Sequence, residues 1–572
     1  MKKLICLFWA VVLCAVFISC NTAENHEESS GSNSTSEQIT EPQKEPERII
    51  TVADLSQFVI VRGMESSDDV GACAQKLQNS IKEKLSLNLT MKSDLVITGN
   101  PAYSEAEFEI LLGVCDRDEC TPVLEELKYY DYTYRISEKK LLICAVSDRA
   151  LQNAVDHFIA NVIENADTAP ESVFFSNDNN AYLYNHDYPF DDIKLMGASI
   201  SEYKLIYPAD NKCKESIVAA IVRGRIRELT GYDLQIEKDS KQKDASGREI
   251  HIGVTDRDTD FAAALELENH AGFVGSNGKN HWLLISNSPV GVVYAADRFI
   301  STLKENTSLD VAELNSDIGI VKPEASEKLA VMTYNIQMWA PWTVGKPEAT
   351  MRIIQDKNPD LFGVQEATLP QWGEFLKNQF GETYGIVDLA LHGIEQADWP
   401  VTENPIFYRK DKFELIESGF KWLTDTPDVN SKLEVSAAIR TFTYAVLERK
   451  SDGLRFVYVN THLDHVDGQP TQAAILVKFL ERFEGYPIIV TGDFNFEVSS
   501  AGYNNMTNGG YLSSKFFCEE KINSQIGTAP SGREVDYCYS NGRNIFFHTY
   551  EVISDPMPSD HYALYIEFSF CK

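Results

Sequence analysis

The sequence predicts an α/β protein in which two small repeated domains precede a larger C-terminal domain. Short apolar runs rich in β-branched and aromatic residues alternate with stretches that have the 3.6-residue period of amphipathic helices. One such pattern occurs twice in the first half, and a different one begins near Leu329. The length of 572 residues exceeds what one hydrophobic core usually supports, which also predicts several domains.

The first 20 residues have the pattern of a signal peptide. Lys2 and Lys3 precede an apolar run over 4–18 that is too short to favour a permanent membrane helix. Cys20 follows this run and resembles the lipid-modified cysteine of bacterial lipoproteins; a plain secretory signal with a chance cysteine is the alternative. Residues 21–48 are polar and rich in Ser, Glu and Pro, as a disordered tether would be. We therefore expect a lipid anchor at the cell surface or on the periplasmic face of a membrane.

The net charge is strongly negative, at −33 with a pI of about 4.7. Residues 327–572 are themselves acidic, so no basic domain is concealed in the total. Non-specific DNA affinity comes largely from Lys and Arg side chains on phosphates, so this charge argues against a broad electrostatic grip on nucleic acid. A nuclease whose local positive charge comes from a bound cation is still compatible with it.

Two predicted domains, 49–188 and 189–320, repeat the order strand, helix, strand, strand, helix. Three segments of the first copy match three of the second in order and spacing. They are LSQFVIVRG (55–63) with ISEYKLIYP (200–208), EILLGVCDRDE (109–119) with EIHIGVTDRDT (249–259), and KLLICAVSDRALQNAVDHFI (140–159) with HWLLISNSPVGVVYAADRFI (281–300).

Each copy has an Asp-Arg-Asp tripeptide after a strand, and we interpret both tripeptides as solvated, self-paired turns. The two units loosely resemble the α/β domains that precede the catalytic barrel in several glycoside hydrolases. The resemblance implies spacer or binding modules, with a glycan as one partner. The cysteines lack zinc-site spacing, and Cys115 and Cys120 could either form a disulfide or stay as buried thiols.

The C-terminal region over 327–572 has apolar runs that end in polar side chains. Expected strands cover 329–336, 359–367, 454–465, 486–496, 533–540 and 561–568, and expected helices cover 345–358 and 469–483. Polar groups gathered at strand ends are how an α/β scaffold builds a site. Their chemistry suits phosphate ester hydrolysis, because carboxylate and amide oxygens are hard ligands for Mg²⁺.

Six motifs in this region, in this order, resemble the endonuclease/exonuclease/phosphatase superfamily, which includes deoxyribonuclease I. The resemblance implies a four-layer α/β sandwich of the deoxyribonuclease-I-like type and a metal-dependent phosphoesterase. The motifs are TYNI (333–336), GVQEA (363–367), NTHLDH (460–465), TGDFN (491–495), VDY (535–537) and SDH (559–561).

By position in these motifs, the resemblance assigns the metal to Asn335 and Glu366, with Asp560 as a further carboxylate on the metal side. The ion would be Mg²⁺ or Mn²⁺. Asp493 would be the base that activates or orients the attacking water, beside Asn495. The reaction would be in-line attack of that water on a phosphodiester or phosphomonoester.

The resemblance assigns a second group of residues to the phosphate. His561 with Asp536 would form a dyad that donates to the phosphoryl oxygens, and His462 would be a second histidine there. Glu403 would orient His462, and Arg440 resembles the arginine that contacts the scissile phosphate.

The sequence leaves the substrate open among nucleic acid, phospholipid and phosphorylated sugars. Trp339, Trp342 and Trp399 lie in loops near the expected site, where aromatic rings stack on bases or sugars, enter a membrane or pack under the loop. The alternative function is a surface lipoprotein that binds a glycan or a protein and carries an inactive phosphoesterase-like domain.

Overall fold

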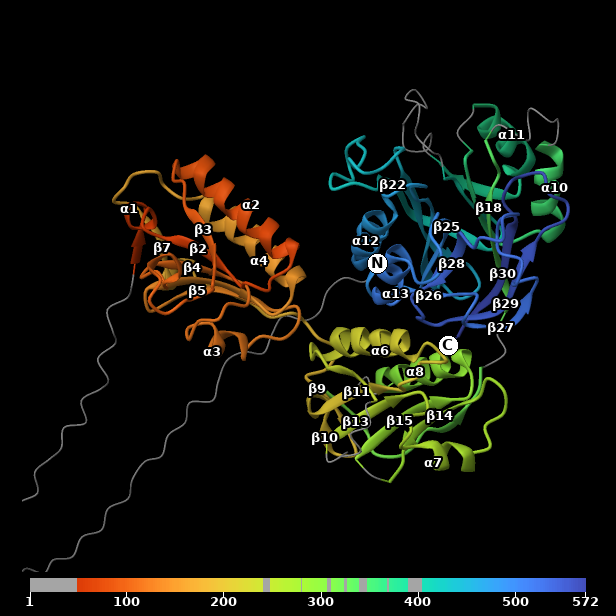
Figure 1. Cartoon of the computed structure of the whole chain (residues 1–572), viewed down its shortest axis with the longest axis horizontal. Coiled ribbons are helices and arrows are strands. Elements are labelled where there is room, and N and C mark those ends of the chain that lie inside the picture. Colours follow the sequence, from red (N-terminus) through yellow and green to blue (C-terminus); the bar gives the residue numbers. More distant parts are fainter. Residues whose placement is uncertain are drawn as a thin grey trace, which may run out of the picture. The chain divides into compact units, whose positions relative to one another are not determined.

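The computed structural model confirms the α/β fold class, with helices packed on mixed sheets in three successive parts of the chain (Figure 1). The structure describes residues 49–239, 247–278, 280–305, 310–323, 327–338, 347–367, 370–388 and 404–571. The expected signal peptide, Cys20 and the tether lie outside these residues. Among the described helices, none is both long and apolar enough to span a membrane.

The first α/β unit is built on a six-stranded sheet whose first four strands are parallel. Two long helices cover one face, and a short helix lies on the other, where Val123 packs with Leu111 and Leu142. In order across the sheet, the strands are β3 (Thr90–Ser93), β2 (Val59–Arg62), β4 (Glu109–Leu112), β6 (Lys140–Ala145), β5 (Tyr132–Ser137) and β8 (Tyr182–Tyr184). The helices are α2 (Asp68–Leu85) and α4 (Asp148–Phe158) on the first face and α3 (Thr121–Leu124) on the second.

The second unit has the same strand order and the same directions, as the matching segments of the sequence predict. Its sheet runs β12 (Ile236–Lys238), β11 (Tyr203–Tyr207), β13 (Arg248–Ile252), β15 (His281–Ser286), β14 (Gly272–Ser276) and β17 (Gly319–Val321). Its helices are α6 (Glu215–Thr230) and α8 (Pro289–Lys304), with α7 (Thr259–Ala264) packed on the opposite face. The domain boundaries at 188 and 320 stay predictions.

The interpretation of the Asp-Arg-Asp tripeptides as solvated, self-paired turns is wrong for three of their members. Arg117 is buried and donates to both oxygens of Glu109, from Nε at 2.9 Å and from Nη2 at 3.3 Å. In the second copy Arg257 pairs with Glu249 at 2.6 Å, and Asp258 is buried. Each arginine therefore pairs with a carboxylate on the preceding strand.

The cysteines of the first unit are free thiols. Like the other cysteines of the described residues, Cys115 and Cys120 form no disulfide, and both are buried. They pack with Leu111 and Leu142 on the face of the sheet that carries α3. The buried-thiol alternative is the one that the structure shows.

The C-terminal domain contains two sheets. One has seven strands in the order β20 (Tyr384–Val387), β21 (Ile406–Arg409), β19 (Leu361–Gln365), β18 (Leu329–Asn335), β30 (Ala563–Phe570), β29 (Ile545–Ile553) and β27 (Cys518–Ile522). The other has six strands in the order β22 (Phe413–Trp422), β23 (Thr441–Arg449), β24 (Arg455–His462), β25 (Ile488–Asp493), β28 (Asp536–Ser540) and β26 (Leu512–Ser513).

The two sheets face each other between two pairs of helices, which gives the expected four layers (Figure 1). Alternation along each strand sends one set of side chains between the sheets and the other set under the helices. On β24, for example, Phe456 and Tyr458 lie between the sheets, and Val457 and Val459 pack with α12. The outer helices are α10 (Pro347–Lys357) and α11 (Pro370–Phe380) on the first sheet, and α12 (Gln469–Leu480) and α13 (Ala501–Asn508) on the second.

A buried amide pair joins the two sheets near the ends of their strands. Gln365 Nε2 donates to Asn460 Oδ1 at 2.7 Å, and Asn460 Nδ2 donates to the Val364 carbonyl at 2.9 Å. Gly363 makes this approach possible, because a Cβ atom there would lie 2.3 Å from Asn460 Cγ. Gln365 and Asn460 therefore link the two sheets near the ends of their strands.

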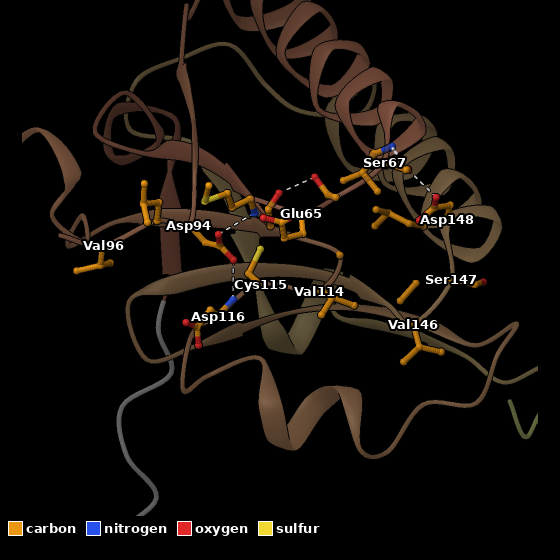
Figure 2. A pocket seen from close by; sticks show the side chains of 18 residues that line it. Glu65, Ser67, Asp94, Val96, Val114, Cys115, Asp116, Val146, Ser147 and Asp148 are labelled. Carbon is orange, nitrogen blue, oxygen red and sulfur yellow. Dashed lines mark hydrogen bonds between the residues drawn. The ribbon is translucent and has the colours of Figure 1, made fainter. Parts of the chain in front are cut away.

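The first unit also has an open cleft of about 810 Å³ at the carboxyl ends of its parallel strands (Figure 2). Clefts in open α/β sheets form at this edge, where loops leave neighbouring strands. Its rim carries the exposed side chains of Val96, Val114 and Val146. Ser67 Oγ donates to Asp148 Oδ2 at 2.6 Å and so joins the first turns of α2 and α4 beside the cleft.

We expect Gly363→Ala to destabilise the C-terminal domain by about 1–3 kcal/mol, because the new methyl group must displace the Asn460 amide. Calorimetry of the full chain should show the loss as a lower unfolding temperature for the transition of this domain. Gly373→Ala is the matched control, since a Cβ at that position of α11 meets nothing within 4 Å. Equal unfolding temperatures for the two variants would contradict the role given to Gly363.

Candidate active site

The candidate site lies at the ends of strands from both sheets of the C-terminal domain, and Asp493 is at its centre. Asp493 is the last residue of β25 and is buried. Its Oδ2 accepts a hydrogen bond from Asn335 Nδ2 at 3.0 Å, across from β18 in the other sheet, and its Oδ1 accepts from the Asn495 backbone at 3.0 Å. The same Oδ2 lies 3.4 Å from His462 Nε2 and 3.6 Å from His561 Nε2.

Asn335 and Glu366 form one side of the site, at the ends of the neighbouring strands β18 and β19. Asn335 Nδ2 lies 3.1 Å from Glu366 Oε1, and the Met338 backbone donates to Glu366 Oε2 at 3.0 Å. Ser559 Oγ donates to the Asn335 carbonyl at 2.6 Å and fixes the loop that carries His561. These contacts bring the TYNI, GVQEA and SDH motifs together.

Three residues of this site have left-handed backbone conformations. The φ angles are +50° at Gln337, +66° at Glu366 and +53° at Asn495. Such conformations are uncommon for residues other than glycine and cluster at functional sites, where surrounding contacts hold them. Here they turn the chain at the strand ends, so that the Glu366 side chain lies beside Asn335.

His561 and Asp536 form the expected pair on the other side of Asp493. His561 Nδ1 lies 2.9 Å from Asp536 Oδ2, and Asp536 is buried as the first residue of β28. Burial lowers the pKa of His561, but the charges of Asp536, Asp493 and Asp560 outweigh it and raise the pKa to about 10. His561 is therefore a cation at neutral pH, with Nε2 directed toward Asp493.

The second histidine of the site, His462, differs from His561 in its charge state. Complete burial, with the nearby charges of Arg440 and His561, holds the pKa of His462 well below its ordinary value, so the ring is neutral. Its Nε2 lies 3.1 Å from Asn495 Nδ2, and its Nδ1 makes no hydrogen bond within the described part of the chain. The site thus pairs one protonated histidine with one neutral histidine.

Arg440 is buried beside this group. Its Nη2 lies 3.2 Å from His465 Nδ1, and its Nε makes no hydrogen bond to a described residue. Burial lowers the pKa of Arg440, while the charges of Asp493, Asp464 and Glu366 partly restore it. A buried guanidinium with an unused N–H group is suited to bind an anion such as a phosphate.

The carboxyl group of Asp493 has a strongly raised pKa of about 7, chiefly because of burial and secondly because of the charge of Asp536. A carboxylate with such a pKa can accept a proton from water near neutral pH. Its two oxygens also face donors from both sheets, which fix its position.

The residues present fit a divalent cation of the Mg²⁺ type. Asn335 and Glu366 lie side by side and carry an amide oxygen and carboxylate oxygens, which are hard ligands. The Asn335 amide nitrogen faces Glu366, and its oxygen accepts a hydrogen bond from the Gln337 backbone. Asp560 lies close enough for the charge of Glu366 to contribute to its raised pKa, after the larger effect of burial. Asp536 Oδ1 is buried without a hydrogen bond, and Asp493, Asp536 and His561 also converge closely enough to share an ion.

The structure thus gathers most of the sequence-predicted residues around Asp493. Glu403 and the three loop tryptophans lie outside the described residues, so their roles stay predictions. Asp464 belongs to the structural framework, because four backbone N–H groups donate to it, from Ala437, Ala438, Val466 and Gly468. Sequence reasoning missed His465 as the neighbour of Arg440, although it ends the NTHLDH motif.

We expect Asp536→Asn to lower the pKa of His561 by about one to three units, because the variant removes the carboxylate charge and keeps the shape of the side chain. Nuclear magnetic resonance titration of ¹³C-labelled histidine would measure this pKa directly. Ser559→Ala is a control that removes a neutral contact of the same loop. An unchanged His561 pKa in Asp536→Asn would show that Asp536 does not set its charge.

Part of the chain matches a known protein family. Residues 332–561 match the model of the Endonuclease/Exonuclease/phosphatase family. No curated protein matches the chain. Similar solved structures include a family protein from Bacteroides thetaiotaomicron, with 23% identity, a TM-score of 0.40 and coverage of 44% of this chain and 100% of that chain.

Two further structures are similar over the same share of the chain. The mannosyl-6-phosphatase of Bacteroides thetaiotaomicron has 23% identity and a TM-score of 0.39, with coverage of 42% of this chain and 100% of that chain. The catalytic domain of human Nocturnin has 20% identity and a TM-score of 0.35, with coverage of 42% and 94%. Because residues 332–561 match the family model, the C-terminal domain of this chain is a member of the endonuclease/exonuclease/phosphatase family.

Proposed function

We propose that the C-terminal domain is a metal-dependent phosphoesterase that hydrolyses phosphodiester or phosphomonoester bonds by in-line attack of an activated water. One observation carries this proposal. Asp493 lies between an oxygen-rich pair, Asn335 with Glu366, and a protonated histidine, His561. Phosphoryl transfer needs these three functions together: a place for a cation, a base for water and a positive donor for the phosphoryl oxygens.

The chemistry follows from the charge states of these side chains. Asp493 takes the proton of the attacking water, and the Asn495 backbone and Asn335 Nδ2 hold its carboxylate in place. His561, charged and aligned by Asp536, donates a hydrogen bond to the phosphoryl oxygens, where negative charge accumulates. Neutral His462 and the buried guanidinium of Arg440 complete the phosphate side.

Asn335 and Glu366 would hold the cation, with Asp560 as the nearby third carboxylate. When bound, Mg²⁺ or Mn²⁺ polarises the phosphoryl group and stabilises the leaving oxygen. The substrate class is a phosphate ester of a nucleic acid, a phospholipid or a phosphorylated sugar.

We propose that the enzyme acts outside the cytoplasm on a lipid anchor at Cys20. The support is the sequence of the first 48 residues, with its basic start, apolar run, cysteine and polar tether. Processing of the full chain should be sensitive to globomycin and lost in Cys20→Ala. If globomycin and Cys20→Ala both leave processing unchanged, the chain carries an ordinary secretory signal.

The main test is hydrolysis of bis-(4-nitrophenyl) phosphate by the purified chain with Mg²⁺ or Mn²⁺. We expect Asp493→Asn to lower kcat by about 10²–10⁴-fold, because it removes the base, and a chelator to abolish the activity. The rate should rise as the pH increases toward about 7, because Asp493 ionises over that range. A bound cation lowers the pKa of Asp493 and shifts this rise to lower pH. The rate should fall only near pH 10, where His561 loses its proton.

Two variants separate the proposed roles. Glu366→Ala should raise the Mg²⁺ concentration that gives half-maximal activity, and excess Mg²⁺ should restore part of the rate. His561→Ala should lower kcat without such rescue. No activity above Asp493→Asn on a panel of DNA, RNA, sphingomyelin, inositol phosphates and phosphorylated sugars would reject the enzyme proposal.

A second candidate function, glycan binding, is favoured by the cleft in the first unit (Figure 2). Its volume lies within the range of about 300–1,000 Å³ that is usual for ligand sites. The carboxylates of Glu65 and Asp116 line it, which suits the hydroxyl groups of a neutral sugar and disfavours anions. The exposed Val114 and Val146 beside them suit the apolar face of a sugar ring.

We therefore expect the full chain to bind neutral oligosaccharides on a glycan array through this cleft. Val114→Trp, which fills the rim, should weaken that binding at least about tenfold. Val173→Trp is the matched control, because Val173 is similarly exposed in the same unit and does not line the cleft. Absence of binding, or equal binding by both variants, would reject this candidate.

A further inference from the structure

The second unit contains a group of two histidines and a glutamate on one face of its sheet. Glu249 and His251 are two residues apart on β13, so their side chains leave the same face. His281 is the register partner of Glu249 on the neighbouring parallel strand β15. Their nitrogen and oxygen atoms lie within 4.8 Å of one another, and the two imidazole rings are 4.6 Å apart.

Both histidines direct Nε2 toward the same carboxylate oxygen. His251 Nε2 lies 2.7 Å from Glu249 Oε2, and His281 Nε2 lies 3.6 Å from it. The other ring nitrogens face polar groups behind them: His251 Nδ1 contacts Asp258, and His281 Nδ1 lies 3.3 Å from the Asn277 amide. His251 has the arrangement of a metal-binding histidine, with one nitrogen directed to the site and the other held by a carboxylate.

His281 provides a second, independent observation. Its side chain is only 4% exposed, yet its Nε2 makes no hydrogen bond to any described residue. A buried polar atom without a partner is costly unless something satisfies it. The only side chain that the described residues offer to this nitrogen is Glu249, at a distance too long for a hydrogen bond.

The surrounding charges favour a cation. Glu249, Asp258 and Asp239 are carboxylates, and the one guanidinium among them is Arg257, which bonds Glu249 at 2.6 Å and Asp239 at 3.2 Å. With both histidines neutral, two negative charges stay uncompensated.

The first unit shows what the same position looks like without the histidines. Leu111 stands where the second unit has His251, and Lys140 stands in place of His281 beside the equivalent glutamate, Glu109. The Lys140 ammonium lies 3.7 Å from Glu109 and supplies a permanent positive charge there. The glutamate and its arginine are common to both copies, whereas the two histidines are particular to the second.

We propose that Glu249, His251 and His281 form a binding site for Zn²⁺ or a similar transition-metal ion, separate from the phosphoesterase site. Two imidazole nitrogens and one carboxylate oxygen are a common zinc ligand set, and imidazole favours zinc, copper and nickel over Mg²⁺. The ion would join β13 to β15, with Nε2 of each histidine and the Glu249 carboxylate as its ligands.

The test uses the full chain carrying both Glu366→Ala and His561→Ala, so that neither candidate metal group of the C-terminal domain is complete. After removal of metals, titration calorimetry with Zn²⁺ in excess Mg²⁺ should show one tight site, and Co²⁺ should give visible absorption typical of nitrogen ligands. His281→Lys on this background should weaken Zn²⁺ binding at least about 100-fold and remove the Co²⁺ signal. The first unit indicates that lysine is accommodated there, so this variant should fold.

Two further variants sharpen the result. Asp258→Asn should weaken Zn²⁺ binding about 10- to 100-fold, because Asp258 orients His251. His270→Ala removes a histidine of the same unit outside the group and should leave binding unchanged. Circular dichroism melting would verify that each variant is folded. Absence of a tight Zn²⁺ site in the chain carrying Glu366→Ala and His561→Ala, or equal Zn²⁺ affinity when folded His281→Lys is added to it, would overturn the proposal.

Discussion

The hydrogen bond between Asn335 on β18 and Asp493 on β25 is the contact on which the candidate site depends, because it joins the ends of strands from two different sheets. The site has no single supporting element. Its residues face one another only while the two sheets keep one register, and the Gln365–Asn460 pair beside it holds that register. A shift of one residue in either strand would move its polar end group to the helix-covered face.

The same layer between the sheets explains the electrostatics. Its apolar part, with side chains such as Val331 and Tyr458, excludes water from the neighbouring polar end. In this low-dielectric environment, Asp493 keeps its proton more strongly than an exposed aspartate, and His561 becomes a stable cation only because Asp536 and Asp493 lie next to it. Pairing therefore keeps His561 protonated and burial keeps His462 neutral, although both belong to one site.

Strand-end residues were predictable from the sequence because the period of two fixes which side chains of a strand share a face. Asn335 and Asp493 are the last residues of buried strands, and both lie where the pattern places them. Asp464 follows His462 by two residues, as His462 follows Asn460, so the period of two would place all three on one face. However, β24 ends at His462. Beyond that point the period no longer applies, and Asp464 accepts backbone hydrogen bonds in a turn.

The errors in the first half of the chain have a related cause. The burial of Arg117 depends on Glu109, which lies eight residues earlier and becomes a neighbour only when β4 is placed in the sheet. The edge strand β3 is short and polar, so its pattern does not distinguish it from a loop. Local periodicity therefore predicts which elements exist, and tertiary pairing decides which polar residues become buried.

The duplicated units separate what the scaffold needs from what each copy can change. Both copies keep a glutamate–arginine pair that links a parallel strand to the turn after it, buried in Glu109–Arg117 and half-buried in Glu249–Arg257. Removing one partner of such a pair would leave a buried charge, so single substitutions there are costly. The positions beside the pair carry no such constraint: Leu111 in one copy packs against apolar neighbours, whereas His251 in the other contacts two carboxylates. The two copies of this chain therefore differ beside the ion pair, where a substitution changes the neighbours of the pair and leaves the pair itself intact.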